Sequence, residues 1–183
     1  MLTRRQALAA GGGALGLAGP GVAAAAGGDR VVLSHAVRIE RLLVWAYEHV
    51  MAAGTLGPGA RDVVSLQLRH EREHLAAVEV ALAMGPLAPL SSRRARELLA
   101  RHHVADDPQH LTTQHRSLRF LVDLESAAEG VWFRTLSKLQ APRLARLGAE
   151  IMASEAQHWT LLSSLSHPGE PKVTVPNAFV RGT

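Results

Sequence analysis

Four long segments of the chain carry apolar residues at the three- and four-residue spacing of an amphipathic helix. We place these segments at about 34–53, 60–84, 112–139 and 143–165, with a shorter helix near 93–102. Gly- and Pro-rich breaks within each pair of long segments are short, so the paired helices must run antiparallel. The long connection 87–111 allows the chain to cross from one pair to the other. This pattern predicts an all-α four-helix bundle with a long crossover between helices 2 and 3.

Composition supports one helical domain and excludes several kinds of site. Of the 183 residues, 4% are aromatic and none is Cys. A cysteine nucleophile, a Cys-ligated zinc and an iron–sulfur cluster are therefore excluded. Basic and acidic residues are interspersed, which argues against a nucleic-acid-binding stripe. No apolar run long enough for a membrane span occurs in 29–183.

The first residues have the layout of an export signal. A short basic start with Arg4-Arg5 precedes a mildly apolar stretch and then the small residues Val22–Ala26. The run Thr3–Leu8 looks like the twin-arginine motif, although Ala7 stands where that motif prefers phenylalanine. We therefore expect a signal peptide over 1–26, the bundle over 29–166 and an extended tail over 167–183. The twin-arginine translocon would then be a partner during export to the periplasm, cell wall or exterior.

Each apolar stripe is interrupted near its middle by one glutamate. In two of the four stripes a histidine follows three residues later, on the same helix face. The residues are Glu40, Glu71 with His74, Glu125, and Glu155 with His158. Glu40 precedes Glu71 by 31 positions and Glu125 precedes Glu155 by 30, so the two halves repeat one layout.

A buried carboxylate without a partner costs several kcal/mol, so four of them in one core need compensation. Two divalent cations would balance the four negative charges, with the neutral imidazoles completing the coordination. One Glu from each of two helices and Glu-x-x-His from the other two is the ligand pattern of two-metal carboxylate bundles. Such ligands favour iron first and manganese second over copper or zinc.

With these residues the chain resembles the ferritin-like superfamily, in particular exported ferritin-like proteins of the desiccation-associated type, related to rubrerythrin and bacterioferritin. In that family an aromatic residue often lies seven positions after the lone glutamate, as Tyr47 and Trp132 do here. The resemblance implies a two-iron centre that reacts with dioxygen or peroxide, in ferroxidase- or peroxidase-type chemistry, or in metal handling. The resemblance is also compatible with a homo-oligomer.

Two alternatives stand beside this interpretation. The carboxylates of a ferritin-like bundle could be protonated or paired with cationic side chains without any metal. Residues His70 to His74 also fit H-E-x-x-H, the zinc-peptidase motif in which both histidines bind zinc and Glu71 is the general base. Glu97 would then be the third ligand. That alternative leaves the buried Glu40, Glu125 and Glu155 unexplained.

The remaining polar and aromatic residues have simpler expected roles. Glu129, one turn after Glu125, could be an extra ligand or could support one. His70 could orient a ligand or lie at the surface. The tryptophans and Tyr47 are expected in the core, and Glu79 in solvent.

Overall fold

The structure, a computed structural model, describes residues 27–104 and 108–174, so the predicted signal peptide lies outside the described residues. The described part consists of helices and contains no strand. Its helices are α2 (Gly27–Ala53), α3 (Pro58–Ala81), α4 (Ser92–Arg101), the 3-10 turn η1 (Pro108–His110), α5 (Gln114–Leu136), α6 (Pro142–Ser166) and α7 (Pro171–Thr174). The predicted all-α fold class is confirmed. None of the described helices is both long and apolar enough to span a bilayer.

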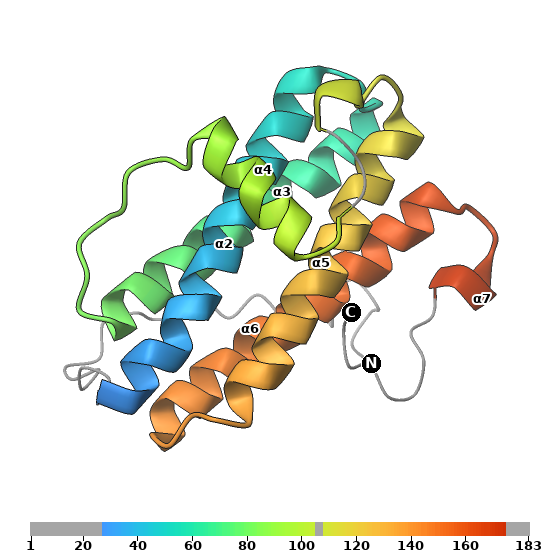
Figure 1. Ribbon diagram of the computed structural model, residues 1–183. Helices are drawn as coiled ribbons and strands as arrows, with labels where there is room; N and C mark the ends of the chain where they lie inside the picture. The colour runs from blue at the N-terminus through green and yellow to red at the C-terminus, as the bar shows by residue number, and fades with distance from the viewer. Residues whose placement is uncertain (1–26, 105–107, 175–183) are drawn as a thin grey trace, which may run out of the picture.

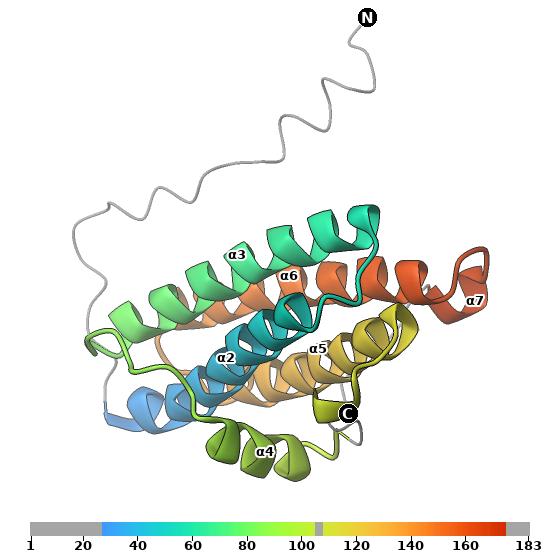
Figure 2. The same cartoon turned by 90° about the horizontal axis from the view of Figure 1, so that it is seen from above.

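Four long helices form the bundle. Helices α2 and α3 are joined by a short loop, as are α5 and α6, and the two hairpins pack together (Figure 1). The long connection between α3 and α5 carries α4, which lies outside the bundle against α2 and α5 (Figure 2). This is the crossover that the sequence predicts.

Local chemistry explains where most helices begin. The Thr113 hydroxyl accepts the N–H of Arg116 and caps α5. Helices α3 and α6 begin with proline, whose missing N–H costs nothing in the first turn.

Helix α2 begins at Gly27, earlier than the predicted start near residue 34. The extra turns are held by the carboxylate of Asp29, which is 2% exposed. It accepts the N–H groups of Gln140 at 2.9 Å and Ala141 at 3.1 Å. These two residues form the loop just before α6, so Asp29 joins the start of the first hairpin to the turn of the second.

We expect Asp29→Ala to lower the free energy of unfolding by about 1–3 kcal/mol, because two part-buried N–H groups lose a charged acceptor. Asp62→Ala is the matched control, since Asp62 is an exposed residue of α3 and its loss should cost no more than about 0.5 kcal/mol. Urea unfolding of both variants measures the difference. Equal stability of the two would contradict the role given to Asp29.

The end of α3 corrects the expectation that Glu79 is solvated. The helix ends at Ala81, and Ala83 takes a left-handed conformation with φ of 50°. The chain then turns back, so that the N–H of Leu87 donates to the Glu79 carboxylate at 3.1 Å. Glu79 is 8% exposed because the beginning of the crossover covers it.

The C-terminal tail, expected to be extended, contains the short helix α7. The N–H groups of Val173 and Thr174 both donate to the carbonyl of Glu170, which closes one helical turn. The part of the predicted tail after residue 174 lies outside the described residues.

The core consists of two apolar clusters at opposite ends of the bundle. One contains Leu43, Val64, Leu121 and Leu162, and the other contains Leu33, Val78 and Ile151, among other residues. The buried glutamates occupy the middle of each long helix, between these clusters. The apolar packing at both ends therefore holds a polar layer in the centre of the bundle.

Candidate metal centre

One glutamate from each long helix reaches the centre of the bundle. Glu40, Glu71, Glu125 and Glu155 have no exposed surface. They lie on α2, α3, α5 and α6 respectively, at the positions where each apolar stripe is interrupted.

The two histidines of the Glu-x-x-His pairs lie against different glutamates. The Nδ1 atom of His74 is 3.0 Å from Glu155 Oε1, 3.7 Å from Glu71 Oε2 and 3.8 Å from Glu40 Oε2. Ligand atoms of these four residues lie within 4.8 Å of one another. They form a first group of side chains that could hold one metal ion.

A second group lies beside the first. The Nδ1 atom of His158 is 2.8 Å from Glu71 Oε1, 3.2 Å from Glu155 Oε2 and 3.5 Å from Glu125 Oε1. Ligand atoms of these four residues also lie within 4.8 Å of one another. All six residues singled out in the sequence thus belong to one of the two groups.

Glu71 and Glu155 belong to both groups. Glu71 turns Oε2 toward His74 and Oε1 toward His158. Glu155 turns Oε1 toward His74 and Oε2 toward His158. The two shared carboxylates therefore span the two groups, while Glu40 and Glu125 each belong to one.

Apart from their contacts with one another, the buried ligand atoms of the centre have no hydrogen-bond partner, which is costly for polar atoms removed from water. The unpartnered atoms are Glu40 Oε2, both carboxylate oxygens of Glu71 and of Glu155, Glu125 Oε2, and the Nδ1 atoms of His74 and His158. Oxygen atoms with a few imidazole nitrogens suit a divalent ion such as iron or manganese. The residues present therefore fit a two-metal centre.

One carboxylate oxygen of each unshared glutamate accepts a hydrogen bond from an aromatic side chain of the opposite hairpin. The indole Nε1 of Trp132 on α5 donates to Glu40 Oε1 at 2.6 Å. The hydroxyl of Tyr47 on α2 donates to Glu125 Oε1. Tyr47 follows Glu40 by seven residues but contacts Glu125. Trp132 follows Glu125 by seven residues but contacts Glu40. Both were expected only to fill the core, and their crosswise contacts depend on the pairing of α2 with α5.

A further layer of polar side chains surrounds His158. His70 places Nδ1 3.0 Å from His158 Nε2, so one imidazole orients the other, and Ser154 Oγ lies 3.4 Å from the same nitrogen. The amide of Gln67 donates to the His158 carbonyl at 3.3 Å. Gln67 and Ser154 were not singled out in the sequence. Each lies four residues before a proposed ligand, which is the only signal that could have found them.

The close packing of acids shifts the pKa values in the centre. Burial, reinforced by the Glu155 carboxylate, raises the pKa of Glu40 well above its usual value and that of Glu125 to about 8. Burial alone would lower the pKa of His74, but Glu155 and Glu71 outweigh it and raise the pKa to about 11. The pKa of His158 is also raised, because Glu125, Glu155 and Glu71 outweigh its burial. The metal-free centre therefore retains protons.

Glu129 lies beside the centre but in neither group. It is 5% exposed, and burial together with the charge of Glu125 raises its pKa to about 7. A supporting role for Glu129 thus fits its position better than a ligand role.

The geometry does not favour the zinc-peptidase alternative. His70 faces the outer nitrogen of His158, and Glu97 pairs with Arg94 at 2.5 Å on α4. Neither His70 nor Glu97 belongs to a metal-competent group among the described residues. The two Glu71 oxygens face the two groups of candidate ligands instead.

Comparison with known families gives one match. A family model described as a ferritin-like domain covers residues 28–168. No match was found among curated proteins or among solved structures.

Proposed function

The chain belongs to the ferritin-like domain family, and we propose that its buried centre binds two divalent metal ions and supports iron redox chemistry. The observation that carries the proposal is the pair of four-residue groups that share Glu71 and Glu155. Four carboxylates offset the charge of two such ions, which explains why a bundle would keep them in its core.

We assign the six residues by the group to which each belongs. Glu40 and His74 would hold one ion, and Glu125 and His158 the other. Glu71 and Glu155 would contact both ions, since each turns one oxygen to each group. Trp132 holds Oε1 of Glu40 and Tyr47 holds Oε1 of Glu125, so Oε2 of each glutamate has no hydrogen bond and could bind a metal.

Iron suits this centre best, with manganese second, because its ligands are four carboxylates and two imidazoles. A bound iron pair would supply electrons for the reduction of dioxygen or peroxide. The protein's own contribution is to bury the ligands and to orient His158 through His70. The step from fold to reaction rests on analogy with the family.

Metal binding is expected to release at least two protons per chain at neutral pH, because both imidazoles must be neutral to bind metal and the carboxyls of Glu40 and Glu125, whose pKa values are raised, must be ionised. The pKa of His74 is raised to about 11 in the metal-free centre, so this side chain is protonated at pH 7. Metal affinity should therefore increase as pH rises. Calorimetric titration of Mn²⁺ in buffers with different ionisation enthalpies measures the number of protons. A heat that does not depend on the buffer would contradict this expectation.

The redox proposal is tested by mixing the protein with Fe²⁺ without oxygen and then adding dioxygen or hydrogen peroxide. We expect the unmodified protein to oxidise Fe²⁺ faster than Glu71→Gln does. The two sites should set the number of Fe²⁺ ions that are oxidised rapidly per chain. Glu73→Gln, an exposed neighbour on α3, is the matched control. Two ions bound without faster oxidation would favour the second candidate, which is metal handling without catalysis.

Export is proposed from the N-terminal sequence alone. Arg4 and Arg5 would direct the protein to the twin-arginine translocon, which carries folded proteins and would let the centre take up metal before export. Replacing both arginines with lysine should retain the protein inside the cell, as measured by fractionation. Unchanged export would contradict the assignment.

A further inference from the structure

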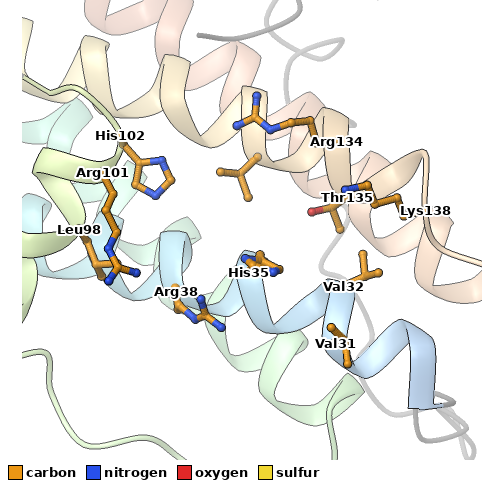
Figure 3. A pocket seen from close by; sticks show the side chains of 11 residues that line it. Val31, Val32, His35, Arg38, Leu98, Arg101, His102, Arg134, Thr135 and Lys138 are labelled. Carbon is orange, nitrogen blue, oxygen red and sulfur yellow. The ribbon is translucent and has the colours of Figure 1, made fainter.

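A second site candidate lies outside the bundle, away from the carboxylates. Helices α2, α4 and α5 enclose a cavity of about 530 Å³, here called the basic pocket (Figure 3). Its polar side chains are mostly basic. They are His35 and Arg38 of α2, Arg101 and His102 at the end of α4, and Arg134 and Lys138 of α5.

Among the residues that the structure describes, no protein group neutralises the charge of the basic pocket. No acidic residue lines it among the residues that the structure describes. Arg38 makes only a 3.4 Å contact with the Ser34 hydroxyl, and within the same residues no ion pair involves Arg101, Arg134 or Lys138. Glu97, the acid of α4, is held instead by Arg94.

Other arginines of the chain behave differently. Arg72 pairs with Glu48 at 2.8 Å, and Arg146 pairs with Glu150 at 2.9 Å. The protein thus has acids beside other surface arginines, but none of the described acids lies in the basic pocket. Bringing like charges together without a counter-charge is unfavourable, so the arrangement is best explained by an anion that binds there.

The repulsion is visible at His102. Burial lowers its pKa, and the nearby charges of Arg134, His103 and Arg101 lower it further. Arg101 of α4 and Arg134 of α5 therefore both act on His102, and Figure 3 shows the three side chains around the pocket.

Apart from Thr135, the remaining wall of the pocket is apolar. Leu98 and Val131 are buried at its inner side, and Val31 and Val32 of α2 line it as well. A volume of this size is within the range of small-molecule sites. Guanidinium groups bind phosphate oxygens in pairs, and several cations together favour a group with more than one negative charge.

We propose that the basic pocket binds an organic phosphate, with the phosphate held by Arg38, Arg101, Arg134 and Lys138 and an apolar substituent packed on Leu98 and Val131. The phosphate could be that of a small soluble ester or of a lipid headgroup. Both present the same chemistry to the pocket, and the proposal does not depend on metal in the bundle.

The test is calorimetric titration of the full chain with phenyl phosphate and with inorganic phosphate. We expect phenyl phosphate to bind more tightly, because inorganic phosphate lacks the apolar part. The double variant Arg101→Gln/Arg134→Gln should weaken binding by about tenfold or more, since charge-assisted hydrogen bonds are lost. The control Arg72→Gln/Arg146→Gln removes the same charge elsewhere and should bind as the unmodified protein does.

Sedimentation with vesicles separates the two sources of phosphate. Binding to phosphatidic acid vesicles but not to phenyl phosphate, lost in Arg101→Gln/Arg134→Gln alone, would support the proposal with a lipid as the ligand. The proposal is overturned if neither probe binds, if both double variants lose binding equally, or if inorganic phosphate binds as tightly as phenyl phosphate.

Discussion

Replacing Glu71 with glutamine is expected to remove both metal ions, whereas replacing Glu40 is expected to remove only one. The difference follows from geometry, because Glu71 turns an oxygen toward each group of ligands while Glu40 belongs to a single group. Glu155→Gln should behave like Glu71→Gln, and Glu125→Gln like Glu40→Gln. Metal analysis of each purified variant measures the number of ions per chain.

Glu73→Gln is the matched control for this series, since Glu73 is an exposed residue of α3 within three positions of Glu71. It should retain the metal content of the unmodified protein. Circular dichroism of each variant shows whether the helices remain. Equal metal loss in Glu40→Gln and Glu71→Gln, with both variants folded, would refute the assignment of shared and unshared ligands.

Removing the metal with a chelator is expected to lower the Tm by about 16–32 °C. Free metal at about a thousand times its Kd stabilises the folded state by about 4 kcal/mol per site, or about 8 kcal/mol for two sites, and each kcal/mol shifts the Tm of a chain of this size by about 2–4 °C. Thermal unfolding with Mn²⁺ and with chelator measures the shift. In Glu71→Gln the two conditions should give nearly the same Tm.

The effect of Glu125→Gln should change sign with metal. Burial raises the pKa of Glu125 from 4.5 to about 8 in the metal-free protein. Because ionisation is less favourable in the folded than in the unfolded protein, this carboxyl lowers the free energy of unfolding as pH rises from 4.5 to about 8. The full loss of stability is present at about pH 9. At about pH 9 and without metal, Glu125→Gln should have a higher Tm than the unmodified protein. With metal, the variant should have the lower Tm. A lower Tm in both conditions would mean that the buried Glu125 charge is not costly without metal, so that no cation is needed to offset it.

The fold was predictable from local signals in most of its length. Helical spacing and Gly or Pro breaks indicated the four long helices and the crossover helix. The early start of α2 was not predictable, because Asp29 finds its partners at Gln140 and Ala141. Burial of Glu79 likewise depends on Leu87, which folds back only after the left-handed residue Ala83. The early start of α2 and the burial of Glu79 both depend on contacts between different segments of the chain. Hydrophobic periodicity within one segment does not predict such contacts.

The membership of the candidate centre was also predictable, since one glutamate interrupts each apolar stripe. Which carboxylates are shared was not, because that depends on how the side chains of α3 and α6 turn between the two histidines. The contacts of Trp132 with Glu40 and of Tyr47 with Glu125 could not be read from spacing alone either. They require α2 and α5 to be neighbours, which is a property of the assembled bundle.

A crystal structure of the iron- or manganese-loaded protein, with anomalous scattering recorded at the absorption edge of the metal, tests the central claim most directly. We predict two anomalous peaks, one beside Glu40 and His74 and the other beside Glu125 and His158, with Glu71 and Glu155 contacting both. A single peak bound by His70 and His74, or no peak among the six side chains at saturating metal, would contradict this account.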